Sequence, residues 1–117
     1  MRIDYGQGEK EAIIGIHTMM IYEQEFRSDI VQDIFGRQVL REEKDGDDVV
    51  FAVDYRNVQW TAALKVLWAA LKTADDSVPS FSEWSNGLGP VNLDEIVSAI
   101  VPEVRRQFFR PRAVEPE

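Results

Sequence analysis

The sequence predicts a mainly α-helical fold with a small β element (α+β), in which a compact helical domain carries a hairpin around residues 38–55. Two observations lead to this prediction. Residues 56–73 are apolar around most of a helical circumference, which is typical of the buried central helix of a bundle. Within 38–55, an Asp-Gly turn signal precedes a segment rich in β-branched residues. The length of 117 residues suits one domain, expected over 1–110, with a short flexible tail over 111–117.

The first 16 residues predict one short strand and leave the next element open. Ile3 and Tyr5 alternate with polar neighbours, which is the pattern of a half-buried strand. A group of three isoleucines then fits either a second strand or the start of a helix: Ile13, Ile14 and Ile16.

Two short helices are expected next. Thr18 is the expected N-cap of a helix over about 19–26, and Ser28 is the expected N-cap of a second helix. Gly36 is placed to end or bend the second helix. Its apolar face comprises Ile30, Val31, Ile34 and Phe35.

The segment 38–55 contains the hairpin signals. The charged run EEKDGDD separates QVLR from VVFAVDY, and the second of these is rich in β-branched and aromatic residues. A hairpin is the favoured interpretation, and a helix that continues past Gly36 into a flexible loop is the alternative.

The central helix is expected over 56–73, with Asn57 as its N-cap. Trp60 and Trp68 lie at helical spacing on one stripe, so we expect both in the core. The first stripe is Trp60, Leu64, Leu67, Trp68 and Leu71, and the second is Val58, Ala62, Val66 and Ala69 or Ala70.

An elbow and a last helix complete the chain. Asp75, Asp76, Ser77 and Pro79 end the central helix, and Ser80 or Ser82 is placed to cap a short turn. Asn92 with Glu95 starts the last helix in a pattern close to a capping box, and Pro102 inside it should kink it. Its buried face is expected to contain Leu93, Ile96, Val97, Ile100, Val104 and Phe108.

No pattern for catalysis, cofactor binding or metal binding is found. The chain has no cysteine and one histidine, His17, with no nucleophile motif beside it. The run Asp45-Gly46-Asp47-Asp48 lacks the spacing of a calcium loop. The formal net charge of −8 disfavours nucleic acid as a partner and favours other proteins. No apolar run approaches the roughly 18 residues that span a bilayer, so no membrane is expected as a partner and a cytoplasmic location is expected.

Aromatic and basic residues supply the candidate partner-binding positions. Trp84 lies between two loops, where it either pins the elbow or meets a partner. Adjacent helical residues do not share a face, so one of Phe108 and Phe109 should point outward beside a group of arginines. The candidate partner-binding residues are Phe81, Trp84, Arg105, Arg106 and Phe109.

Four segments in order resemble a known family. They are IYEQEF, a short helix with Asp-Ile-Val, the stretch LWAALKTADDSVPSFSEW, and a Leu-Asp-Glu-Ile helix with an internal proline. Together, over roughly residues 13–108, they resemble the tail assembly chaperones of siphophages and prophages of Gram-positive bacteria. The stretch LWAALKTADDSVPSFSEW carries most of this resemblance, and its motifs are patterns rather than a catalytic signature.

The resemblance implies a non-enzymatic protein that acts in the cytoplasm of the bacterial host cell during tail assembly. Members bind the helical tape-measure protein, keep it soluble, help to recruit tail-tube protein, and are absent from the finished virion. Weak self-association to a homo-oligomer is compatible with this role. The alternatives are a structural tail connector or completion protein, which virions would contain, and a small bacterial helical adaptor.

Overall fold

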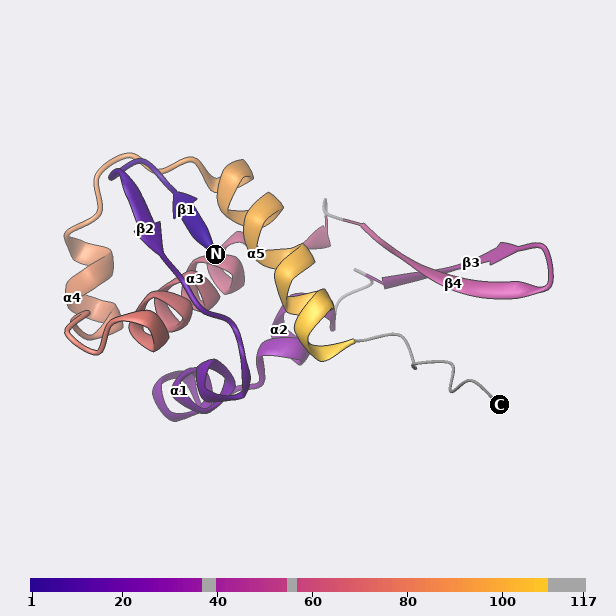
Figure 1. Cartoon of the computed structure of the whole chain (residues 1–117), viewed down its shortest axis with the longest axis horizontal. Helices are drawn as coiled ribbons and strands as arrows, with labels where there is room; N and C mark the ends of the chain where they lie inside the picture. Colours follow the sequence, from indigo (N-terminus) through magenta and orange to yellow (C-terminus); the bar gives the residue numbers. More distant parts are fainter. Residues whose placement is uncertain (37–39, 55–56, 110–117) are drawn as a thin grey trace.

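The computed structural model describes residues 1–36, 40–54 and 57–109, and the predicted tail over 111–117 lies outside this part of the chain. The described part is mainly helical with a small β content, as the sequence predicts, and this β content forms two small antiparallel sheets where one hairpin is predicted (Figure 1). The elements in order are β1 (Arg2–Asp4), β2 (Glu9–Glu11), α1 (Ile16–Phe26), α2 (Ile30–Phe35), β3 (Leu40–Asp45), β4 (Asp48–Val53), α3 (Trp60–Ala74), α4 (Phe81–Asn86) and α5 (Leu93–Phe108).

Helix α3 is the centre of the fold. It packs against α1, α2, α4 and α5, and also against β2. The alanines on it are small enough to let these neighbours approach closely, and the large side chains between the two alanine pairs fill the core. The predicted central helix is thereby confirmed. Its buried residues are Ala62, Ala63, Val66, Leu67, Trp68, Ala69, Ala70 and Leu71.

The start of α3 differs from the prediction. The helix begins at Trp60 with Gln59 as its N-cap, and Asn57 instead donates its backbone N–H to the Asp54 carbonyl at 3.1 Å. Trp60 is 46% exposed, so its predicted place in the core is wrong, whereas Trp68 is buried. Val58 just before the helix and Ala62 in its first turn are buried, so the core covers this end of α3 on their side and leaves the Trp60 side uncovered.

Helices α4 and α5 begin at the predicted caps. The Ser80 hydroxyl accepts the Glu83 N–H at 3.3 Å, and the Asn92 side chain accepts the Glu95 N–H at 3.2 Å. Pro102 lies inside α5 as expected. Leu93 and Phe108 are only partly buried against the core, and Val101 joins the buried face, which is Ile96, Val97, Ile100, Val101 and Val104.

The N-terminal strands form a small hairpin that covers part of α3 and α5. β1 pairs antiparallel with β2, with Ile3 opposite Lys10, and Ile3 and Tyr5 are buried as the alternation predicts. The second strand uses Glu9–Glu11 rather than the three isoleucines, and the helix begins at Ile16. Gly6 turns the chain with a φ of 115°, and a Cβ added there would lie 2.7 Å from the Pro90 carbonyl oxygen.

Two predicted caps near α1 and α2 are wrong. α1 is capped by Gly15, and Thr18 is a buried residue of its first turn. α2 is capped by Asp29, whose side chain accepts the Gln32 N–H at 3.0 Å, and Gly36 ends this helix as predicted. The Thr18 hydroxyl contacts Thr73 on α3, which the local sequence does not reveal, and the Ser28 hydroxyl donates to the Asp33 side chain within α2 rather than capping a backbone N–H.

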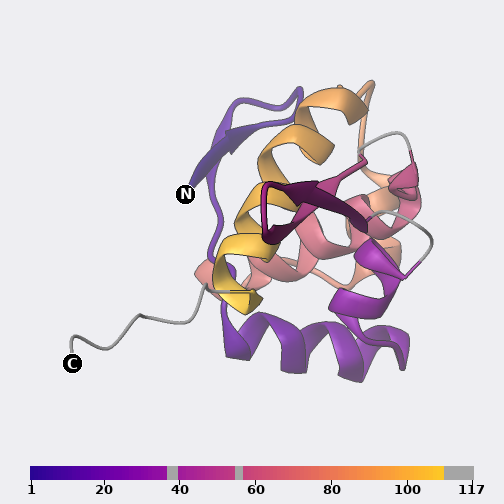
Figure 2. The same ribbon diagram turned by 90° about the vertical axis from the view of Figure 1, so that its right-hand side faces the viewer.

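The β3–β4 hairpin projects from the helical body (Figures 1 and 2). Its strands are antiparallel with Asp45 opposite Asp48, and Gly46 takes a φ of 66° in the turn. The predicted hairpin is confirmed over 40–53, and the alternative of a continuing helix is wrong; residues 38, 39 and 55 lie outside the described part. None of the helices in the described ranges is both long enough and apolar enough to cross a bilayer.

Candidate partner-binding site

The outward face of α1 carries the most exposed large apolar side chains among the helices and the N-terminal hairpin. Ile16 is 68% exposed and Met20 is 58% exposed. They are four residues apart, so they lie on consecutive turns of one face. The opposite face of α1 buries Thr18 and Tyr22 against the body. Ile13, just before the helix, is exposed as well.

The start of α1 is held in place by the buried Thr18 hydroxyl. It accepts the Gly15 N–H at 3.1 Å, donates to the Ile13 carbonyl at 2.8 Å, and lies 2.9 Å from the Thr73 hydroxyl on α3. The Ile13 N–H also donates to the Ala70 carbonyl of α3 at 3.1 Å. The exposure of Ile13 and Ile16 is therefore a property of a fixed backbone and not of a frayed helix end.

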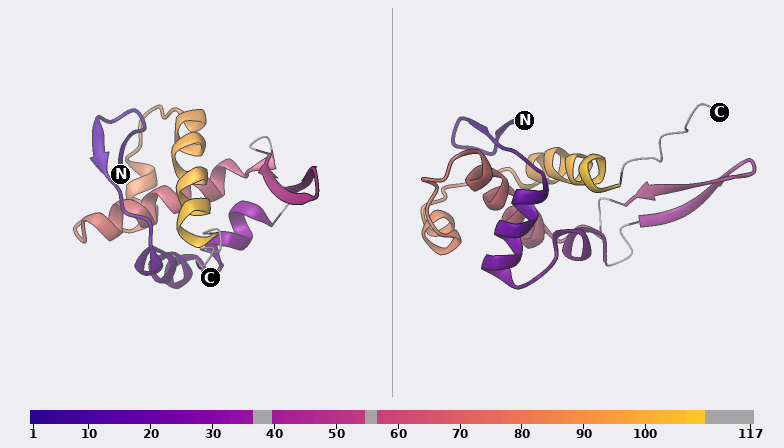
Figure 3. Two further views of the ribbon diagram at one scale, coloured as in Figure 1. Left: turned by 45° about the vertical axis from the view of Figure 1, so that its right-hand side comes forward. Right: turned by 60° about the horizontal axis from the view of Figure 1, so that its bottom comes forward.

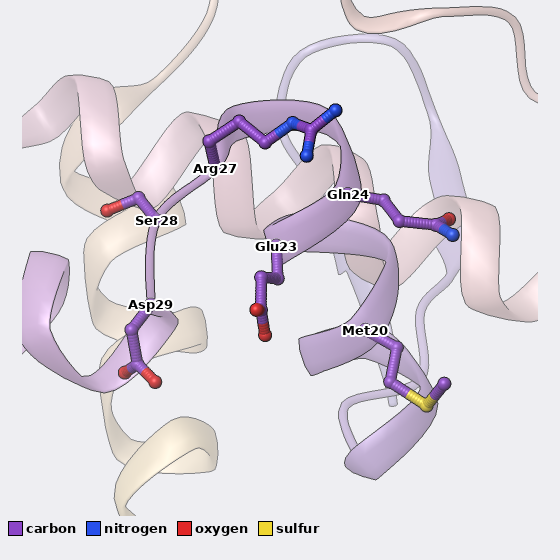
Figure 4. Close-up of a pocket in the computed structure, with 6 residues that line it drawn as sticks. All are labelled: Met20, Glu23, Gln24, Arg27, Ser28 and Asp29. Carbon is purple, nitrogen blue, oxygen red and sulfur yellow. The ribbon is translucent and has the colours of Figure 1, made fainter.

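The exposed stripe of α1 continues into an open groove at the turn to α2 (Figure 4). The groove has a volume of about 600 Å³. Arg27 takes a φ of 54° there and donates its backbone N–H to the Glu23 carbonyl at 2.8 Å, which ends α1. The residues that line the groove, hereafter the α1 groove, are Met20, Glu23, Gln24, Arg27, Ser28 and Asp29.

Charge in the α1 groove is divided between its two sides. Figure 4 shows the carboxylates of Glu23 and Asp29 on one side of the helix end, and the Arg27 guanidinium beyond them on the other side, near Gln24. Met20 points to the same side as the Glu23 carboxylate. A ligand that spans this groove therefore meets the apolar Met20 side chain at one end and the Asp29 carboxylate at the other, with the Glu23 carboxylate between them.

A hydrogen-bonded cluster fixes the angle between α1 and α2 behind the groove. The Tyr22 hydroxyl donates to Asp33 Oδ2 at 2.7 Å, and the Ser28 hydroxyl donates to Asp33 Oδ1 at 2.7 Å. Burial and the acceptor carboxylate of Asp33 raise the pKa of the Tyr22 hydroxyl well above its ordinary value. Both oxygens of Asp33 are thus paired, which explains how a carboxylate is accommodated at this junction.

The elbow between α3 and α4 is an aromatic cluster. The Trp68 indole N–H donates to the Pro79 carbonyl at 2.9 Å, and the Lys72 ammonium donates to the Val78 carbonyl at 2.8 Å. Phe81 and Trp84 are half-buried beside this turn. Ring centroids lie 5.0 Å apart for Phe26 and Phe81, 6.0 Å for Trp68 and Phe81, 6.0 Å for Phe81 and Trp84, and 5.9 Å for Tyr5 and Trp84.

A second, smaller hollow of about 350 Å³ lies between the N-terminal hairpin and the elbow. Trp84 and Tyr5 contribute aromatic surface to it, and Lys10, Glu11 and Asp75 contribute charge. The Ser77 hydroxyl and N–H both donate to the Asp75 carboxylate, and they hold the pKa of Asp75 below its usual range. Asp75 therefore serves the local turn.

The other predicted partner-binding residues lie at the end of α5. Arg105 and Arg106 are exposed, and Arg106 pairs with Glu103, which holds the pKa of that carboxyl below its usual range. Phe109 is 42% exposed, and its ring meets the buried Phe35 edge-on at 5.2 Å. Phe108 is partly buried, so this aromatic pair divides between inside and outside as predicted.

The five predicted partner-binding residues do not form one surface. Phe81 and Trp84 lie on α4, whereas Arg105, Arg106 and Phe109 lie at the far end of α5, and the views agree that these places are separate (Figures 1 and 3). Sequence reasoning did not identify the face of α1. The sequence signal for this face is the i, i+4 spacing of Ile16 and Met20, which places both on the side of the helix opposite Thr18 and Tyr22.

Comparison of the chain with models of protein families, with curated proteins and with solved structures found no match. Within the described residues there is no cluster of three or more His, Cys, Asp or Glu side chains that could hold a metal ion. His17, the histidine considered for catalysis, is exposed on α1.

Proposed function

We propose that this protein is a non-enzymatic tail assembly chaperone of a siphophage or prophage. It binds the tape-measure protein in the cytoplasm of the bacterial host cell, keeps it soluble, and helps to recruit tail-tube subunits. The observation that carries the proposal is the stretch LWAALKTADDSVPSFSEW, which has the pattern of that chaperone family.

The packing of this stretch supports a role in shaping the protein. Trp68, Lys72 and Phe81 make the contacts that turn the chain between α3 and α4. These contacts are structural, so a family pattern in this stretch would preserve an elbow rather than a reactive group. Such a scaffold suits a protein that acts through its surface.

The surface supports binding to a helical partner. Exposed apolar side chains on a fixed helix are the usual means of covering an apolar stripe on another helix. The net charge of −8 helps to keep a complex soluble after the apolar surfaces are covered. A tape-measure protein, with long apolar helical stripes, would gain from both features.

Co-expression with the tape-measure protein encoded in the neighbouring tail genes tests the proposal. We expect the tape-measure protein to move into the soluble fraction and to co-purify with the chaperone, while purified tails lack the chaperone. A tape-measure protein that stays insoluble, together with this chain in purified tails, would replace the proposal by a structural tail component. Omission of this chain from the same expression strain is the control.

A further inference from the structure

The outward face of α1 has the properties of a docking surface for a helix. Ile16 and Met20 are the two most exposed large apolar side chains among the helices and the N-terminal hairpin. Beyond Met20 this face becomes the polar α1 groove, which includes Arg27. At a rise of 1.5 Å per residue, the whole face from Ile16 to Arg27 is about 16 Å long. That length matches three turns of a partner helix.

The charges around this face select the kind of helix. Glu23 and Asp29 supply two carboxylates to the α1 groove, whereas Arg27 supplies one guanidinium. No ion pair of Glu23 or Asp29 with a described basic residue is present, because the Asp29 side chain is engaged with the Gln32 N–H and Arg27 points to the other side. An approaching helix with basic residues beside its apolar stripe would find complementary charge here.

The geometry points to one occupant. We propose that the outward face of α1, formed by Ile16, Met20 and the α1 groove, binds an amphipathic helix of a partner protein that has Lys or Arg beside its apolar stripe. The identification of that partner as the tape-measure protein rests on the proposed function, but the binding chemistry does not. The Thr18 contacts to Ile13 and Thr73 hold the face in its binding geometry before the partner arrives, which lowers the entropic cost of binding.

A synthetic peptide tests this chemistry without the natural partner. The probe is a fluorescent helical peptide of about 20 residues with leucines at i, i+3, i+4 and i+7 and lysines beside them. A matched peptide carries glutamates in place of the lysines. We expect fluorescence anisotropy to show binding of the lysine peptide that weakens with salt, and binding of the glutamate peptide at least about tenfold weaker.

Variants of the full chain locate the site. Ile16→Gln with Met20→Gln keeps good helix formers and should weaken binding of the lysine peptide at least about tenfold. Glu23→Gln with Asp29→Asn keeps the cap of α2 and should reduce the salt dependence. The matched control is Trp60→Gln, which removes an exposed aromatic side chain elsewhere on the molecule and should leave affinity within about twofold. Circular dichroism checks that each variant is folded.

Three results would overturn the inference. They are no binding of the lysine peptide to the native chain, equal binding by the Ile16→Gln/Met20→Gln variant, and a native dimer that this variant converts to monomer in light scattering. The last result would show that a second copy occupies the face.

Co-expression separates the two proposals: if the variant still solubilises the tape-measure protein, the chaperone function stands and this site falls. If the peptide binds at α1 but the tape-measure protein never binds, the site stands and the chaperone function falls.

Discussion

Replacement of Trp68 by phenylalanine should strongly destabilise the protein. Trp68 is 2% exposed, and its indole N–H donates to the Pro79 carbonyl at 2.9 Å. The change removes that hydrogen bond, which contributes about 1 kcal/mol, and the smaller ring leaves unfilled volume in the core, which costs about 1–2 kcal/mol more. The expected loss in the free energy of unfolding is therefore about 2–3 kcal/mol.

Urea unfolding followed by circular dichroism measures this loss, with Trp60→Phe as the matched control. Trp60 is 46% exposed and begins the same helix, so its replacement should change the free energy of unfolding by less than about 0.5 kcal/mol. In thermal unfolding, the Trp68→Phe midpoint should fall by roughly 8–12 °C at about 4 °C per kcal/mol.

The reasoning is refuted if Trp68→Phe unfolds within about 0.5 kcal/mol of the native chain, or if both variants lose the same amount. Either result would mean that the elbow does not depend on the indole. The aromatic contacts of Phe81 alone would then have to account for the turn.

Three further changes test the caps, turns and buried cluster. Tyr22 keeps its proton in the folded state, whereas the unfolded chain releases it near pH 10, so the stability of the protein should fall as pH rises above about 10. In thermal melts, Tyr22→Phe should flatten that fall. An equal fall in the native chain and the variant would contradict the assignment. Gly6→Ala should lower the free energy of unfolding in urea by about 1–3 kcal/mol, because a positive φ is combined with a clash at Pro90. Gly8→Ala should lower it less, because a Cβ at Gly8 meets open space. Equal losses in the two variants would show that the clash does not contribute. Asn92→Ala should cost about 1 kcal/mol by the same assay while Asn92→Asp is nearly neutral, and a neutral alanine variant would rule out the cap.

Local signals explain what could be predicted from the sequence. Ser80 and Asn92 use their side chains on their own helix, so the caps of α4 and α5 are readable from neighbouring residues. The Asp-Gly turn of the hairpin is equally local, because Gly46 alone supplies the positive φ. Thr18 has the same chemistry as a cap, but its hydroxyl reaches Thr73, which is 55 residues away in the chain.

The candidate site escaped prediction for a related reason. Helical periodicity gives the angle of a side chain around the axis, but it does not say which side neighbours cover. Trp60 was expected inside and is exposed, whereas Ile16 lies on a helix whose buried side is set by the Tyr22–Asp33 contact. The packing of α1 and α2 on α3 is what leaves Met20 facing outward in the same groove as the Glu23 and Asp29 carboxylates.

The central position of α3 has a consequence for the order in which the molecule opens. Amide protons of a helix that contacts all the others should exchange with solvent only when the whole body unfolds. The β3–β4 ladder, which projects from that body, can open and exchange by itself. Amide exchange should therefore be slow in α3 and fast in the β3–β4 hairpin. A partner bound on α1 would slow exchange in α1 and leave the exchange rates of the hairpin unchanged.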